Sequence, residues 1–145
     1  EAAQSADLDC LIDISVNAHI PESYVESLTL RLDVYRRIAD IRNKEDSLDV
    51  KDELKDRFGE IPESVLGLID IALIRNCANA MGIYEIRQTD TNVLLFVKEI
   101  KSPKVIELLS RLNGRAMLSA GNKPYITIRC GGGSSLDMLK KVFKI

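Results

Sequence analysis

Apolar and polar residues alternate at the start of the chain. From Ile12 to Ile20 every second residue is apolar, and the residues between them are polar, His19 included. A period of two is typical of a strand with one buried and one solvated face. We predict a strand over residues 11–20 that ends at Pro21, because proline cannot donate a hydrogen bond to a sheet.

Three segments with helical spacing of apolar residues follow. The first covers residues 22–42, and its spacing predicts an inward-facing apolar side. That side consists of Val25, Leu28, Leu32, Tyr35 and Ala39. The second helix covers residues 49–59, with Ser47 as its predicted N-cap and Gly59 at its end. The third covers residues 62–81 and is apolar around most of its circumference, which is typical of a buried helix.

The second half of the chain mixes strands with shorter helices. The pattern predicts strands over residues 83–88, 93–98, 115–120 and 125–129, and helices over residues 103–112 and from Ser134 or Ser135 to about Phe143. This half therefore consists of strand-strand-helix twice. Together with the three preceding helices, the order predicts an α+β fold in which a small mixed or antiparallel sheet packs with helices.

The composition is that of an ordinary globular domain. Of 145 residues, 46% are hydrophobic and 29% are charged, which excludes disorder as the main state. We predict a single domain over residues 11–145, preceded by a linker or disordered extension over residues 1–10. Since the chain opens on short polar residues without an initial Met, we expect it to be a piece of a longer protein.

The charges are distributed unevenly along the chain. The formal net charge is only -2, which argues against a strongly basic nucleic-acid clamp. Residues 1–97 hold 10 basic and 19 acidic side chains, net -9, whereas residues 98–145 hold 10 basic and 3 acidic ones, net +7. Such a split indicates either that the two halves attract each other or that each offers a face to a different partner.

Residues that could carry catalysis or hold a metal are scarce. His19 is the single histidine, which excludes zinc motifs built on two histidines, and its place in the pattern predicts a solvated side chain. Cys10, Cys77 and Cys130 form no CxxC pair, so neither a disulfide framework nor a zinc site is indicated, and a reducing cytosol is expected. The glycines at 131–133 match neither a P-loop nor a dinucleotide fingerprint. We predict no catalytic residue, no metal site, no cofactor and no membrane span in this chain.

One group of charged residues stands out on the second predicted helix. At about 100° per residue, Glu53, Asp56 and Arg57 project together beside the apolar side of that helix. Glu53 and Arg57 are four residues apart and can form an ordinary surface pair, worth about 0.3–0.5 kcal/mol. Alternatively, the three residues form a charged docking face for a complementary partner. The pattern alone leaves both interpretations open.

Several rare residue combinations occur in an order that is characteristic of one family. They are Ile20-Pro21 with Tyr24, Arg31-Leu32 with Tyr35-Arg36-Arg37, and Glu53-Leu54 with Asp56-Arg57-Phe58-Gly59 and Pro62. With them, residues 11–83 closely resemble the C-terminal domain of bacterial transcription-repair coupling factors, the Mfd family. The order of elements in the remainder of the chain is compatible with this family.

The resemblance implies a regulatory interaction domain that is not itself an enzyme. In this family the intact protein is an ATP-driven DNA translocase that displaces stalled RNA polymerase and recruits the excision-repair protein UvrA. Its C-terminal domain acts as an autoinhibitory clamp on the N-terminal UvrA-binding module, and the family's contact residues correspond to Glu53, Asp56 and Arg57. The resemblance further implies a cytoplasmic, nucleoid-associated bacterial protein that binds ATP, Mg²⁺ and DNA through motor domains outside this chain, without a membrane partner.

Two other functions remain open beside the clamp. The basic C-terminal half could contact DNA phosphates, which would make binding strongly dependent on salt. Its basic residues are Lys98, Lys101, Lys104, Arg111, Arg115, Lys123, Arg129, Lys140, Lys141 and Lys144. An enzyme with an unrecognised site is the other alternative, although a single histidine and the lack of a metal-binding motif leave it little chemistry.

Overall fold

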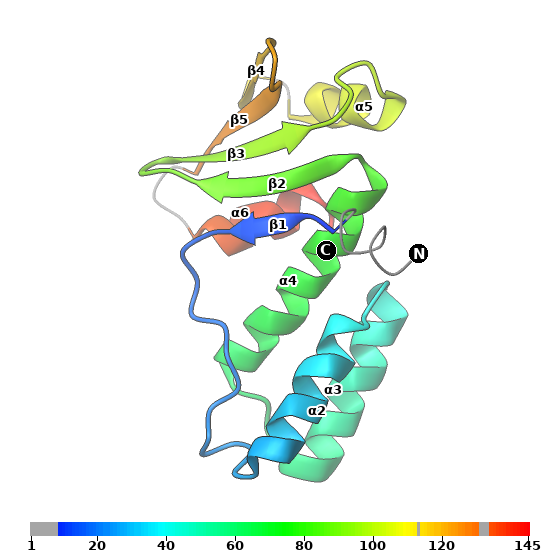
Figure 1. Cartoon of the computed structure of the whole chain (residues 1–145), viewed down its shortest axis with the longest axis vertical. Coiled ribbons are helices and arrows are strands. Elements are labelled where there is room, and N and C mark those ends of the chain that lie inside the picture. Colours follow the sequence, from blue (N-terminus) through cyan, green and yellow to red (C-terminus); the bar gives the residue numbers. More distant parts are fainter. Residues whose placement is uncertain (1–8, 113, 131–133) are drawn as a thin grey trace. The chain divides into compact units, whose positions relative to one another are not determined.

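The computed structural model describes residues 9–112, 114–130 and 134–145. Within these residues the chain forms five helices and one sheet of five strands, shown in Figure 1. The helices are α2 (Leu28–Ala39), α3 (Lys44–Phe58), α4 (Glu63–Ala80), α5 (Pro103–Arg111) and α6 (Ser135–Val142). The strands are β1 (Leu11–Asp13), β2 (Ile83–Gln88), β3 (Asn92–Val97), β4 (Ala116–Ser119) and β5 (Tyr125–Arg129).

The sheet has the strand order β1-β2-β3-β5-β4. Only β1 and β2 pair in parallel, and the other neighbours are antiparallel, so the sheet is mixed. From β2 onward the elements follow one another as strand-strand-helix twice, ending with α5 and α6. The predicted α+β class and the predicted order of the second half are confirmed.

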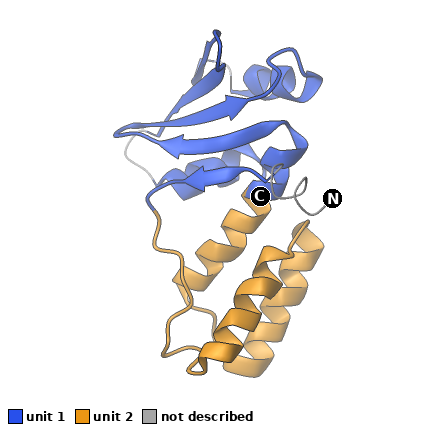
Figure 2. Cartoon of the chain, in the orientation of Figure 1, with its two compact units in different colours: residues 1–15, 75–144 blue, residues 16–74, 145 orange. Residues whose placement is uncertain are grey.

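The described chain separates into two compact units, which Figure 2 colours separately. Residues 16–74 and 145 form a helical unit around α2, α3 and most of α4, and its core includes Val34, Ile38, Leu54 and Ile69. Residues 1–15 and 75–144 form a sheet unit, to which α4 contributes its last residues. In the sheet unit, β3 and β5 alternate between buried and less buried positions, as expected of a sheet with one covered face.

The first strand is shorter than predicted. The sheet ladder ends at Asp13, and residues 14–20 are not part of a strand. Asp13 lies opposite Arg87, and β2 ends one residue later at Gln88. The segment after Asp13 therefore soon runs out of a partner strand. Beyond the ladder, the Ser15 N–H donates to the side-chain oxygen of Gln88 at 2.7 Å. The alternation of burial still continues to Ile20, so the pattern identified the solvated side of an extended segment correctly and its length as a strand wrongly.

Helix α2 begins later than predicted and buries a different side. Ser27 is its N-cap and accepts from the Leu30 N–H at 3.3 Å, so the helix starts at Leu28 and not at residue 22. Leu28 and Leu32, predicted to face inward, are 62% and 47% exposed. The side chains buried instead are those of Val34 and Ile38. The sequence carries two apolar rows at helical spacing, and packing in the core of the helical unit, which periodicity does not encode, selects between them.

Helix α3 begins earlier than predicted. Its N-cap is Asn43, whose side-chain oxygen accepts from the Asp46 N–H at 2.8 Å. Ser47, the predicted cap, is a buried residue inside the helix, and its hydroxyl donates to the Lys44 carbonyl at 2.6 Å. Asn43 and Ser47 can both act as an N-cap, and they lie four positions apart. The helix begins directly after the first of them, Asn43. Its end at Gly59, which has a φ of 93°, is as predicted.

The remaining boundaries agree closely with the sequence. Helix α4 spans Glu63–Ala80, and Ser134 caps α6 by accepting from the Asp137 N–H at 3.4 Å. The glycines at 131–133 and the first eight residues of the predicted N-terminal extension lie outside the described residues. The Cys10 N–H, at the end of that extension, donates to the side-chain oxygen of Asn79 on α4 at 2.7 Å.

Candidate docking surface on helix α3

Helix α3 is fixed in the helical unit on one side and faces solvent on the other. Val50 and Leu54 are buried in the core, while most charged residues of the helix are exposed. Tyr24 secures its C-terminal end: the hydroxyl donates to the Gly59 carbonyl at 2.9 Å, and the ring lies 5.7 Å from the ring of Phe58. Carbonyls at the C-terminal end of a helix have no donor within the helix, so the Tyr24 hydroxyl supplies a hydrogen bond that water would otherwise make.

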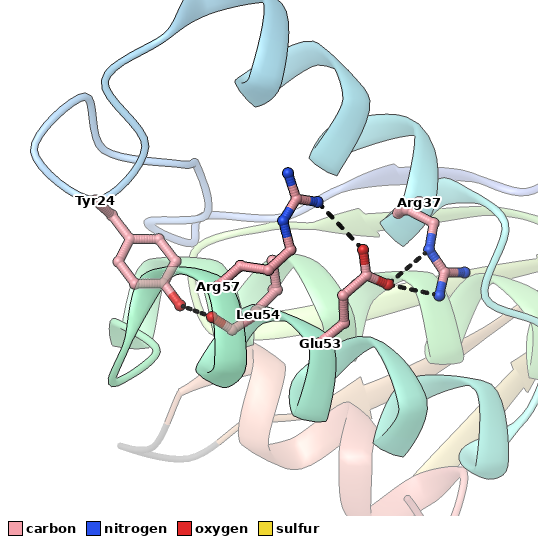
Figure 3. A network of polar contacts seen from close by, with 5 residues as sticks. All are labelled: Tyr24, Arg37, Glu53, Leu54 and Arg57. Atoms are coloured by element: carbon pink, nitrogen blue, oxygen red, sulfur yellow. Dashed lines mark hydrogen bonds and ion pairs between the residues drawn. The ribbon is translucent and has the colours of Figure 1, made fainter.

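Glu53 is the centre of a polar network on this surface, drawn in Figure 3. One of its carboxylate oxygens accepts from Nε and Nη2 of Arg37 on α2, at 3.1 and 2.8 Å. The other accepts from Nη1 of Arg57 at 3.3 Å. Charge-assisted bonds of this kind are shorter and stronger than neutral ones. The network therefore joins α2 to α3 and holds two guanidinium groups beside one carboxylate.

The Glu53–Arg57 contact is the ordinary helix pair that the sequence spacing allowed, and it is confirmed. The Arg57 guanidinium also lies over the Phe58 ring, 4.9 Å from its centroid, which restricts the arginine further. This contact does not exclude a docking role. A carboxylate offers about four acceptor positions, and Glu53 uses three of them here.

The electrostatics follow from these contacts. Hydrogen bonds from Arg37, joined by those from Arg57, lower the pKa of the Glu53 carboxyl below its usual range. The same contact raises the pKa of Arg37. Both partners are therefore held in their charged forms near neutral pH. Because both side chains reach the surface, the pair presents fixed charges to any approaching molecule.

Asp56 lies on the same helix, one turn from Glu53, and is exposed. Within the part of the chain that the structure describes, its side chain forms no hydrogen bond or ion pair. The structure thus places all three predicted residues on one side of α3, with Glu53 and Arg57 paired and the Asp56 carboxylate available. The cleft beside them, lined by Glu53, Arg57 and their neighbours on α2, has a volume of only about 20 Å³. It is too small for an organic ligand, whose sites span about 300–1,000 Å³.

Arg37 is the participant that sequence reasoning did not select. It stands in the Tyr35-Arg36-Arg37 combination that marked the resemblance, which is the signal that could have identified it. Periodicity could not, because it does not show which side of α2 meets α3. Its neighbour Arg36 points elsewhere and pairs with Asp33 at 3.6 Å.

Other residues of the recognised combinations hold the helical unit together. The Tyr35 hydroxyl accepts from the Ile20 N–H at 2.9 Å, which fixes the extended segment before α2. Nη1 of Arg31 donates to the carbonyls of Val25 and Glu26 at 2.8 and 2.9 Å. These side chains satisfy backbone groups that lie outside regular secondary structure. Tyr35 and Arg31 therefore have a structural role in the helical unit.

The other sequence candidates take no part in this surface. His19 is exposed, as predicted, and its backbone N–H donates to the Ser64 carbonyl at 3.2 Å. Among residues 9–112, 114–130 and 134–145 there is no cluster of His, Cys, Asp and Glu side chains that could hold a metal ion. Across those same residues, no helix has the length and apolar character that crossing a membrane requires.

The chain is a small α+β domain. The surface of α3 carries an open network of charged side chains, and the cleft beside it is too small to enclose a ligand. Comparison with known proteins gives the family. The family model described as TRCF domain matches residues 14–107, and the chain belongs to this family, a domain of transcription-repair coupling factors.

Curated bacterial relatives agree with this assignment. The chain is 28% identical to the transcription-repair-coupling factor of Bacillus subtilis over 148 aligned residues, which cover 98% of this chain and 13% of that protein. It is 30% identical to the factor of Rickettsia prowazekii over 77% of this chain and 10% of that protein. The factor of Mycobacterium bovis is 38% identical over 54% of this chain and 6% of that protein. The chain thus spans about a tenth of the length of these relatives.

A solved structure has the same fold. The crystal structure of a C-terminal domain of transcription-repair coupling factor matches with a TM-score of 0.81 and 17% sequence identity. The match covers 93% of this chain and 88% of that one. The α+β architecture is therefore that of a C-terminal coupling-factor domain.

Proposed function

We propose that this domain is a non-catalytic regulatory clamp, which docks through Glu53, Asp56 and Arg57 on the N-terminal UvrA-binding module of its own coupling factor. The clamp keeps the UvrA-binding surface covered until the factor engages stalled RNA polymerase. The parent protein is an ATP-dependent DNA translocase of the bacterial cytoplasm, associated with the nucleoid, and its motor domains hold ATP and Mg²⁺. The domain itself uses no cofactor.

The arrangement around Glu53 carries the proposal. Arg37 and Arg57 hold the carboxylate in place before any partner arrives, so docking costs little side-chain entropy. The Asp56 side chain, exposed and without a partner among the described residues, offers a second carboxylate on the same side. A partner that presents arginines would pair with Asp56 and with the remaining acceptor position of Glu53.

Weak docking suffices for a clamp within one chain. Tethering raises the effective concentration of the two modules to about the millimolar range for short linkers, so an interface of low intrinsic affinity stays closed. An exposed charged interface also opens readily, because a competing partner needs to supply only a few kcal/mol to shift the population. These properties favour release by polymerase over permanent assembly.

A binding assay between separate modules tests the proposal. The N-terminal UvrA-binding module of the same factor and this chain are mixed at low salt, and their affinity is measured by calorimetry. We expect weak binding that Asp56→Lys reduces at least about tenfold, because it replaces attraction with repulsion. The matched control is Glu45→Lys, the same charge change on the same helix about 16 Å along its axis. Unchanged binding by Asp56→Lys, or an equal loss in both variants, contradicts the proposal.

A further inference from the structure

A groove in the sheet unit gathers basic side chains from several elements. It has a volume of about 850 Å³ and is bordered by the end of α5, the segment leading into β4, the end of β5 and α6. Its apolar lining consists of Leu112, Ile128, Met138 and Val142. Its basic lining consists of Arg111, Arg115, Arg129 and Lys141, and Asp137 is the acidic residue among the described lining. Four positive charges therefore face one negative charge.

These four basic groups lack neutralising partners. Across the residues that the structure describes, none of them forms an ion pair or a hydrogen bond through its side chain. The arginines that do pair with carboxylates lie on other surfaces: Arg36, Arg37, Arg57 and Arg87. The groove is thus a concave site with uncompensated positive charge, where a bound anion would replace the missing carboxylates.

Two of the arginines lie at the same end of the β4–β5 strand pair. Strand β4 pairs with β5 in a register that runs from Ser119 opposite Tyr125 to Ala116 opposite Ile128. Arg115 immediately precedes β4 and Arg129 is the last residue of β5, so the two arginines flank the end of this ladder, and both line the groove. Like charges gathered on one surface repel each other. An anion between the two guanidinium groups would remove this repulsion and gain bonds from both.

We propose that this groove binds the phosphate backbone of double-stranded DNA. Guanidinium groups match phosphate oxygens in a bidentate manner, and three of the four basic residues are arginines. The described lining contains no Phe or Tyr, so it offers no platform on which the bases of a single strand would stack. Backbone contacts alone suffice for duplex binding, which is then independent of sequence and governed by charge.

A salt series tests the proposal. A fluorescently labelled mixed-sequence duplex is titrated with this chain at several NaCl concentrations, and anisotropy gives the affinity. Four phosphate contacts predict a slope of log affinity against log salt of about -3 to -4, at about -0.9 per contact. The double variant Arg115→Gln, Arg129→Gln should reduce the magnitude of this slope by about 2 and weaken binding at low salt at least about tenfold.

A matched variant separates the groove from general charge. Lys98→Gln with Lys101→Gln removes the same two charges from exposed positions of the sheet unit outside the groove. It should bind duplex with nearly the wild-type slope. An equal loss in both double variants would overturn the proposal, as would a wild-type slope between 0 and -1. Binding of a polyglutamate peptide or of pyrophosphate, with no binding of duplex, would overturn the assignment to DNA.

Cys130 supplies a test on the unaltered protein. Its side chain lines the groove, whereas Cys77 lies on α4 and is not among the lining residues. Saturating duplex should slow alkylation of Cys130 by iodoacetamide several-fold and leave the rate at Cys77 unchanged, as followed by mass spectrometry. Unprotected Cys130 in a chain that is saturated with duplex would overturn the proposed location.

Discussion

The carboxylate of Glu53 on α3 accepts two hydrogen bonds from the guanidinium of Arg37 on α2, at 3.1 and 2.8 Å. The same carboxylate accepts a third from Arg57, one turn further along α3. One residue of the predicted docking face is therefore also a link between two helices of its own unit. Substitutions of the two carboxylates should therefore differ in effect. A substitution of Glu53 changes both the contact between α2 and α3 and the charge on the surface, whereas a substitution of Asp56 changes the surface charge alone.

The first prediction concerns the strength of the Arg37–Glu53 link. In a double-mutant cycle with Arg37→Met and Glu53→Gln, we expect a coupling free energy of about 0.2–1 kcal/mol, because both side chains are partly exposed to solvent. Urea unfolding followed by circular dichroism measures it. A coupling near zero would show that the Arg37–Glu53 contact contributes nothing to the stability of the fold. The contact would then serve only to position the Glu53 carboxylate for a partner.

Acid should weaken the same link. Hydrogen bonds from Arg37 lower the pKa of Glu53 in the folded state relative to the unfolded state. The resulting stabilisation is present above the unfolded-state pKa, about 4.3, and is lost as the pH falls through the lower folded-state value. Between about pH 7 and about pH 3, Glu53→Gln should therefore lose less unfolding free energy than the wild type. Identical pH dependence of the two proteins would contradict the shift.

Two glycines in the helical unit predict opposite effects of the same substitution. Gly59 has a φ of 93° and a ψ of -159°, a backbone conformation that is essentially restricted to glycine, so Gly59→Ala strains the backbone and should cost about 1–3 kcal/mol. Gly67 lies inside α4, and a Cβ there would meet Ala18 Cβ at 3.5 Å, an ordinary contact. Gly67→Ala should stabilise by about 0.4–1 kcal/mol, because it restricts the unfolded chain. Thermal unfolding compares the two, and a stabilising Gly59→Ala would contradict the assigned end of α3.

The cysteines should differ in reactivity. Burial raises the pKa of the Cys10 thiol to about 12, partly opposed by Arg75, and burial also raises the pKa of Cys77. A protonated thiol is a poor nucleophile, so Cys10 should resist a disulfide reagent at about pH 8 until the sheet unit unfolds. Cys130 is half-buried beside the groove and should react first. Labelling of Cys10 in the native protein at the rate of Cys130 would contradict this order.

The sequence predicted which elements form better than where α2 and α3 begin and where β1 ends. Helices with strong terminal signals, such as α3 ending at Gly59, were predicted at the observed residue. The start of α3 was missed because both Asn43 and Ser47 can cap a helix, and the sequence does not say which does. The buried side of α2 was missed for a related reason: two apolar rows share the helix, and only tertiary packing chooses Val34 and Ile38.

The candidate site was predictable in part. Spacing alone placed Glu53 and Arg57 together, and the contact between them is observed. Arg37 is 16 positions away in the sequence and belongs to another helix, so no local pattern relates it to Glu53. The basic groove was visible only as scattered charge, because its members come from four elements that the fold brings together.

The most direct test of the clamp is the UvrA affinity of the full-length coupling factor, wild type against Asp56→Lys, at one fixed salt concentration. The Asp56 side chain has no partner within residues 9–112, 114–130 and 134–145, so this variant should keep the fold, and Glu45→Lys controls for the change in net charge. We expect the Asp56→Lys factor to bind UvrA at least about tenfold more tightly, a gain of about 1.4 kcal/mol, and the Glu45→Lys factor to bind it as the wild type does. Wild-type affinity in a folded Asp56→Lys factor would show that this helix face does not hold the clamp closed.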